Sequence, residues 1–113
     1  LAVGITPILC MEESDITPQF AAIEEEYYSK CLYCFEPSLD IGGTVTASPD
    51  VIANIKKKIH HFYPGARFMY GGSVTPDNIT SLLPLNLYGV LVASASLDPQ
   101  SFLSIVQQSS HER

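Results

Sequence analysis

Four times along this chain, a Ser, Thr or Asp is followed at once by Pro, and a short apolar run precedes each pair. The pairs are Thr17-Pro18, Ser48-Pro49, Thr75-Pro76 and Asp98-Pro99. A side-chain oxygen caps the first turn of a helix, and proline at the first helical position loses no hydrogen bond. The apolar runs cover residues 5–11, 31–36, 67–71 and 89–94. They are rich in β-forming residues, so the pattern predicts strands and helices in strict alternation.

Strands that alternate with helices form a parallel sheet joined by right-handed crossovers. A closed (β/α)8 barrel needs about 250 residues, whereas this chain has 113. We therefore predict an α/β fold in which residues 1–113 are a single domain with about four βα units, half of a TIM barrel. Either the other half is absent from this sequence, or two copies combine.

The expected helices carry apolar stripes. In the helix that starts at Pro49, the stripe consists of Val51, Ile52, Ile55, Ile59 and Phe62, close to the helical period. In the helix after Asp98, we expect Phe102, Leu103 and Val106 to be buried.

The composition argues against several classes of partner. The net charge of −6 disfavours nucleic acid, and no apolar stretch reaches the roughly 18 residues that span a membrane. Without a basic leader followed by an apolar segment, we expect a cytoplasmic protein. Cys10, Cys31 and Cys34 have no disulfide-framework spacing. We interpret Cys31 and Cys34 as buried structural thiols, and we expect neither a metal site nor a cofactor.

Gly71 and Gly72 come directly after the third apolar run. Two adjacent glycines let the backbone turn sharply and approach another group closely, because neither has a Cβ. Taken alone they favour an ordinary turn. A second possibility is that their backbone faces a bound anion, and the surrounding sequence has to decide between the two.

Four segments together resemble the triosephosphate isomerase family, in the order of its fifth to eighth βα units. They are PILCMEE (7–13), FEPSLDIGGTVTASP (35–49), YGGSVTPDN (70–78) and GVLVASASLDP (89–99). The resemblance implies a homodimeric, cytoplasmic enzyme of glycolysis and gluconeogenesis that needs no cofactor. It implies interconversion of dihydroxyacetone phosphate and glyceraldehyde 3-phosphate by proton transfer through a carboxylate.

The resemblance also assigns residues. Glu36 matches the catalytic base, at the carboxyl end of a strand where such barrels place their chemistry. Residues 37–46 match a lid that closes over the substrate. Within it we single out Pro37, Ile41, Gly43 and Thr44. The expected contacts to the substrate phosphate are Gly42, Ser73, Ala93 and Ser94.

Several residues depart from the family pattern. Ala93 and Ser94 stand where two glycines are usual, and the Cβ of Ala93 narrows the approach to a phosphate. The lid differs at Leu39, Asp40, Thr44 and Val45. Of these, Asp40 places a negative charge on a loop that is expected to close over the doubly charged substrate phosphate, which would oppose binding.

The family's catalytic lysine and histidine belong to the first four units. None of His60, His61 and His111 matches that histidine by motif. Electrophilic stabilisation is often the largest catalytic contribution. We therefore expect negligible activity from this chain unless a partner segment supplies those groups.

Three functions remain open at this point. The chain is the second half of a working isomerase, a divergent relative that binds phosphate or serves as a scaffold without catalysis, or another phosphate-binding barrel enzyme. The third class shares the closing phosphate loops but not the FEP segment and the lid sequence after it. Fold alone does not choose among them.

Overall fold

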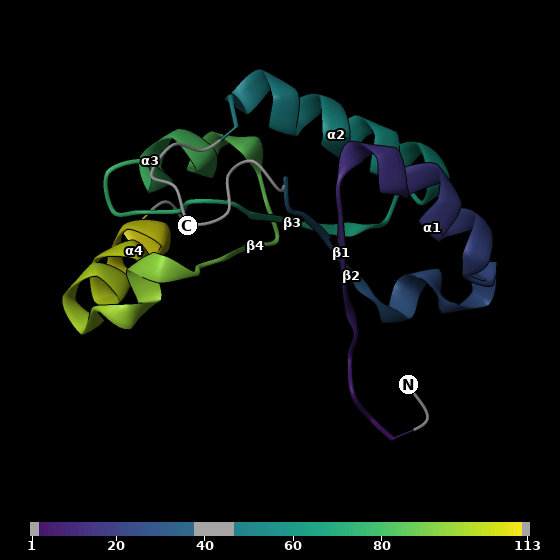
Figure 1. Ribbon diagram of the computed structural model, residues 1–113, viewed down its shortest axis with the longest axis horizontal. Helices are drawn as coiled ribbons and strands as arrows, with labels where there is room; N and C mark the ends of the chain where they lie inside the picture. The colour runs from purple at the N-terminus through teal and green to yellow at the C-terminus, as the bar shows by residue number, and fades with distance from the viewer. Residues whose placement is uncertain (1–2, 38–46, 112–113) are drawn as a thin grey trace.

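The computed structural model describes residues 3–37 and 47–111, which form a four-stranded sheet with helices (Figure 1). The strands are β1 (Ile8–Met11), β2 (Leu32–Phe35), β3 (Arg67–Gly71) and β4 (Gly89–Leu91). All neighbouring pairs are parallel, in the order β1-β2-β3-β4. One row of partners crosses the whole sheet, because Cys10 pairs with Cys34, Cys34 with Met69, and Met69 with Gly89.

Four helices connect or follow these strands: α1 (Ile16–Ala22), α2 (Pro49–Phe62), α3 (Ile79–Leu82) and α4 (Pro99–His111). Short 3-10 turns at Glu13–Asp15, Glu25–Lys30, Leu83–Leu85 and Ser94–Leu97 complete the connections. In Figure 1, α1, α2 and α3 lie on the same side of the sheet, and α4 lies beyond β4. The alternation of strands and helices predicted from the sequence is therefore confirmed.

The hydrophobic core lies between the sheet and this layer of helices. Tyr33 and Phe35 of β2 and Phe68 and Tyr70 of β3 are almost fully buried members of one apolar cluster. Successive side chains of a strand point to opposite faces. Cys34 therefore points to the other face, with its row partners, and it is not a member of the cluster.

The sheet is open. Among the described residues, β1 pairs only with β2, and β4 pairs only with β3. On the face away from the helices, Ile8 remains 43% exposed. A four-stranded parallel sheet of this kind is consistent with half of a (β/α)8 barrel, as predicted.

Two of the four predicted helix starts are confirmed. Helix α2 begins at Pro49, and the side chain of Ser48 accepts a hydrogen bond from the amide of Val51 at 3.3 Å. Helix α4 begins at Pro99, and Asp98 Oδ1 accepts one from the amide of Gln100 at 3.2 Å.

The other two helix starts were placed wrongly. Helix α1 begins at Ile16, so Thr17 lies inside it rather than capping it. Thr75 and Asn78 bond each other reciprocally: the Thr75 amide donates to Asn78 Oδ1 at 2.9 Å, and the Asn78 amide donates to Thr75 Oγ1 at 3.3 Å. This closed turn delays the start of α3 to Ile79.

The predicted apolar stripes were only partly correct. In α2, Ile52, Ile55 and Ile59 are buried as predicted, whereas Val51 and Phe62 are 46% and 37% exposed. The ring of Phe62 stacks on Phe20, with the centroids 5.0 Å apart.

In α4 the prediction was wrong. Ile105 is buried, while the three residues expected inside are 44–48% exposed: Phe102, Leu103 and Val106. Helix α4 does not close onto the sheet, because a groove lined by Val90 and Ile105 remains between β4 and the helix.

Replacing Ser48 by alanine should lower the free energy of unfolding by about 1 kcal/mol, because the Val51 amide loses its cap. Urea unfolding followed by circular dichroism measures the change. Thr17→Ala is the matched control: Thr17 is exposed and lies inside α1, so this variant should be neutral or slightly stabilising. Equal destabilisation by both variants would contradict the capping role of Ser48.

Candidate active site

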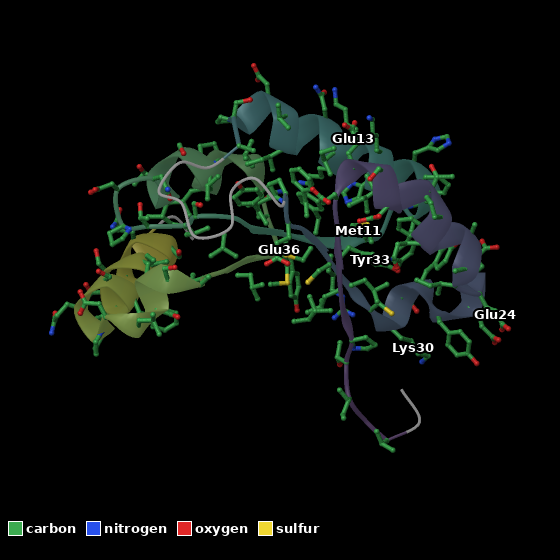
Figure 2. All side chains as sticks on the ribbon, viewed as in Figure 1. Met11, Glu13, Glu24, Lys30, Tyr33 and Glu36 are labelled. Carbon is green, nitrogen blue, oxygen red and sulfur yellow. The ribbon has the colours of Figure 1, made fainter. Side chains whose placement is uncertain are left out.

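Glu36 directly follows β2 and is held at the carboxyl end of the sheet (Figure 2). Its amide donates a hydrogen bond to the carbonyl oxygen of Met11 at 3.0 Å, which continues the pairing of β1 and β2 by one residue. Because residues two apart on a strand share a face, Glu36 lies on the face of Cys34, away from the helices. Its side chain is half-buried. The carboxylate is therefore fixed at its base and still accessible.

Gly71 makes room for this carboxylate. A Cβ at Gly71 would lie 3.4 Å from Glu36 Oε1, 3.2 Å from Cys34 Sγ and 3.0 Å from Leu91 Cβ. Gly71 has no positive φ, so its role is not an unusual backbone turn. This glycine instead leaves room above β3 for Glu36 and for the side chains of Cys34 in β2 and Leu91 in β4.

Two thiols accompany Glu36. Partial burial of the thiol within an otherwise exposed residue, followed by the charge of Glu36 and a hydrogen bond to it, raises the pKa of Cys10. Burial, followed by the interactions with Cys10 and Glu36, raises the pKa of Cys34 to about 12. Cys31 and Cys34 are buried, as predicted from the sequence, whereas Cys10 is exposed.

The loop after β3 holds Ser73 in a left-handed conformation. Its φ of 50° is uncommon for a residue other than glycine. Asn78 stabilises this loop, because its side-chain amide donates to the Ser73 carbonyl oxygen at 2.8 Å. Ser73 is half-buried, and its position in space is set by the closed turn between Thr75 and Asn78.

The segment after β4 contains Ala93 and Ser94, both exposed. The Ala93 backbone has φ −98° and ψ −99°, and Ser94 begins a 3-10 turn. The carbonyl oxygen of Ala93 accepts bonds from the Ser96 amide at 3.0 Å and the Ser96 hydroxyl at 2.6 Å. The turn is thus closed on itself at the carboxyl end of β4.

Because the strands are parallel, their carboxyl ends meet at one edge of the sheet. The described site residues predicted from the sequence all follow such ends: Glu36, Pro37, Ser73, Ala93 and Ser94. Four other predicted residues lie outside the described residues: Ile41, Gly42, Gly43 and Thr44. Their roles, and those of the five at this edge, stay predictions.

Tyr70 was not singled out in the sequence analysis. It is buried in β3, and its hydroxyl oxygen accepts a hydrogen bond from the amide of Ala47 at 2.9 Å. Ala47 immediately precedes the cap of α2, so this bond ties the chain that enters α2 to the centre of the sheet. The sequence signal for such a bond was the tyrosine, with its polar hydroxyl, within the apolar run RFMYG.

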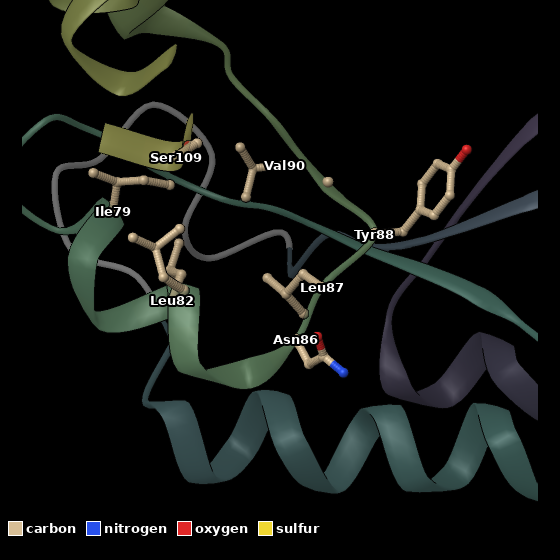
Figure 3. Close-up of a pocket in the computed structure, with 9 residues that line it drawn as sticks. Ile79, Leu82, Asn86, Leu87, Tyr88, Val90 and Ser109 are labelled. Atoms are coloured by element: carbon tan, nitrogen blue, oxygen red, sulfur yellow. The ribbon is translucent and has the colours of Figure 1, made fainter. Parts of the chain in front are cut away.

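A separate apolar pocket lies away from Glu36. It has a volume of about 180 Å³ and lies between α3, β4 and the end of α4 (Figure 3). Apolar side chains such as Ile79, Leu82 and Val90 line it, with Asn86 and Ser109 as polar neighbours. Since its described lining contains no cationic group, we do not assign an anion to it.

Comparisons with known proteins agree with the resemblance noted from the motifs. The family model for triosephosphate isomerase matches residues 1–109. The triosephosphate isomerase of Solibacter usitatus is 34% identical over 94% of this chain, and the match covers 53% of that relative. Those of Mycoplasmopsis agalactiae and Aquifex aeolicus are 36% and 35% identical over 94% of the chain, covering 46% and 52% of their lengths. The chain thus spans about half the length of these curated relatives.

The described helices include none with the length and apolar character needed to cross a membrane.

Replacing Tyr70 by phenylalanine should accelerate hydrogen exchange at the Ala47 amide by about tenfold, because the amide loses its acceptor. Exchange detected by NMR or mass spectrometry measures this. Tyr33→Phe is the matched control, since it removes a buried hydroxyl that donates to the Tyr28 carbonyl oxygen at 2.7 Å. Should the control accelerate exchange at Ala47 equally, the effect would be global loosening and not loss of this bond.

The stability should fall in alkaline solution. Folding raises the pKa of Cys34 from 9.0 and that of Tyr33 from 10.0, each to about 12. Since the fold favours the neutral forms, their contribution is complete below about pH 9 and is lost as the pH rises toward 12. Unfolding free energies measured across this range should decrease, and less steeply in Cys34→Ala. A pH-independent stability above pH 9 would contradict the assignment.

Proposed function

The chain belongs to the triosephosphate isomerase family, and on that premise we propose that it forms the second half of an enzyme that interconverts dihydroxyacetone phosphate and glyceraldehyde 3-phosphate. Glu36 is the proposed base: it takes a proton from the carbon next to the carbonyl and returns it to the neighbouring carbon. A positioned carboxylate performs such transfers efficiently when it lies within hydrogen-bonding distance of the reacting group.

The location of Glu36 is the main support for this proposal. Its carboxylate lies at the carboxyl end of β2, over Gly71 and on the face away from the helices. In a closed barrel that face is the interior, and the carboxyl ends of the strands form the mouth of the active site. A substrate at the mouth would meet the carboxylate directly.

The substrate phosphate is the second part of the proposal. Ser73 and the turn at Ala93 and Ser94 follow the last two strands, where barrel enzymes commonly bind phosphate. Both turns are closed by their own hydrogen bonds, so their backbone amides are held in place before a ligand arrives. Gly42 would add a donor from the segment that closes over the substrate.

We propose that the electrophile comes from outside the part of the chain that the structure describes. The histidines with a described side chain, His60 and His61, lie in the last turn of α2. This is the amino-terminal side of β3, opposite to Glu36. We propose that the lysine and histidine of the reaction belong to the four βα units that complete the barrel. Assembly as a homodimer and a cytoplasmic location, both implied by the family, stay predictions.

A second candidate is a relative that binds phosphate without catalysis. Its support is Ala93, because the family resemblance predicts a close backbone approach to the phosphate at this position and a Cβ would limit that approach. The two candidates differ in turnover, and not in binding.

Complementation tests the proposal. The chain is produced together with the first four βα units of the Aquifex aeolicus isomerase, and conversion of glyceraldehyde 3-phosphate is measured in the purified complex. We expect turnover in the complex but not in the isolated chain. Glu36→Gln should reduce kcat by about 10²–10⁴-fold, the usual contribution of a general base. The matched control is Glu26→Gln, an exposed carboxylate far from the carboxyl ends of the strands, which should leave kcat unchanged.

A stable complex that binds inorganic phosphate but does not convert the substrate would favour the non-catalytic candidate. Turnover that survives Glu36→Gln would remove Glu36 from the role of base.

A further inference from the structure

Ser73 has a backbone conformation that serine rarely adopts. Among the described residues other than glycine, only Ser73 and Asn86 have a positive φ, at 50° and 58°. Asparagine tolerates this left-handed region because its short polar side chain can bond locally, whereas serine is not enriched there. Such a conformation persists only where neighbouring groups enforce it. The support for Ser73 therefore comes from the surrounding structure.

Asn78 provides this support through its side chain. The side-chain nitrogen donates a hydrogen bond to the Ser73 carbonyl oxygen at 2.8 Å, and the side-chain oxygen accepts one from the Thr75 amide at 2.9 Å. An amide group donates only through its nitrogen and accepts only through its oxygen, so these two backbone groups fix its orientation. The Asn78 side chain thus holds the backbone on both sides of Val74, whose own side chain is buried.

Asn78 stands at the N-cap of α3, but its side chain does not cap that helix. An asparagine at this position usually accepts a hydrogen bond from an amide of the first helical turn. Within the described chain, the Asn78 side chain makes no capping bond of this kind. It bonds instead to the loop that precedes the helix. The side chain therefore stabilises the loop around Ser73 and not the start of α3.

The bond to the Ser73 carbonyl oxygen also sets the direction of the Ser73 amide. In a helical conformation of either hand, the N–H and C=O groups of one residue point in opposite directions. Because Asn78 holds the carbonyl group toward the turn, the amide of Ser73 points away from it. In an extended conformation both groups would project to the same side. Loss of the left-handed conformation would therefore redirect the amide.

Helix α4 holds the same turn from outside. The side-chain nitrogen of Gln108 donates a hydrogen bond to the Pro76 carbonyl oxygen at 3.1 Å. The same nitrogen lies 3.1 Å from the Ser104 hydroxyl oxygen, one helical turn earlier in α4, which keeps the Gln108 side chain in place. The loop after β3 is thus fixed from within by Asn78 and from α4 by Gln108.

We propose that Asn78 is a positioning residue for the substrate phosphate. It keeps Ser73 in the left-handed conformation and so presents this residue to the anion in a fixed orientation. This role rests on the proposed function, in which Ser73 contacts the phosphate. A binding group that is oriented in advance does not have to be ordered when the ligand arrives, which strengthens binding. Asn78 acts through Ser73, and we assign it no contact with the substrate.

The affinity of the complemented barrel for inorganic phosphate, measured by isothermal titration calorimetry, tests this role. Asn78→Ala should weaken phosphate binding by about five- to tenfold, the effect of losing one hydrogen bond. In the turnover assay, the KM for glyceraldehyde 3-phosphate should rise by a similar factor while kcat changes less, because the phosphate does not react.

Ser81→Ala is the matched control. It removes a hydrogen bond from the Ser81 hydroxyl to the Asn78 carbonyl oxygen at 2.8 Å and leaves the bond to Ser73 intact. This variant should not change the phosphate affinity. If Asn78→Ala does not fold, Asn78→Ser takes its place. A serine hydroxyl there can still accept a bond from the Thr75 amide, but it is too short to reach the Ser73 carbonyl oxygen as well.

A double-mutant cycle with Ser73→Gly tests whether Asn78 acts through the backbone of Ser73. Glycine adopts a positive φ without a steric penalty. The loss of phosphate affinity on Asn78→Ala should therefore be smaller in the Ser73→Gly background than in the native one. The three-bond coupling between the amide and α protons of Ser73, measured by NMR, reports φ directly. In Asn78→Ala it should change from the value of a positive φ to that of a negative φ.

Three results would overturn the proposal: unchanged phosphate affinity of a folded complex after Asn78→Ala or its serine replacement, an equal loss in Ser81→Ala, or an equal loss with and without Ser73→Gly. The NMR measurement does not depend on the proposed function. A native complex that binds no phosphate would count against the proposed function. A φ of Ser73 that stays positive in Asn78→Ala would count against the positioning role.

Discussion

The two-residue period of the parallel strands is the constraint on which the rest of the structure depends. It sends Tyr33, Phe35, Phe68 and Tyr70 toward the helices, where they are buried. The intervening residues are sent to the opposite face, where Cys10, Cys34 and Glu36 meet. Slippage of β2 by one residue would exchange these two sets. Packing of the core and placement of the Glu36 carboxylate therefore depend on the same register of β2.

Local rules account for what the sequence predicted of the fold. Ser48 and Asp98 cap helices in the expected way, because the capping oxygen and the proline are adjacent in the chain. The same rule failed at Thr75, where the side chain of Asn78 offered a competing turn. The apolar stripe of the last helix, a separate rule, wrongly predicted the burial of Phe102, because a stripe does not say whether another element covers it.

Predicting the site required more than local rules. Glu36 was identified by its resemblance to a family, since a single carboxylate beside a proline has no distinctive pattern. The thiol pair and the bond from Ala47 to Tyr70 were missed because they join segments far apart in the chain. Such contacts depend on how distant segments are placed relative to one another, and hydrophobic periodicity within one strand does not encode that placement. The purpose of Gly71 likewise became clear only when Glu36 and Leu91 were placed around it.

The outer edges of β1 and β4 affect the tendency of the isolated polypeptide to self-associate in solution. Within the described chain, each of these strands has one hydrogen-bonded neighbour, and an unsatisfied edge can recruit strands from any nearby chain. Self-association of this type depends on encounters between molecules, whereas unfolding does not. The yield of the isolated half should therefore be governed by its concentration during refolding more than by the temperature at which it is stored.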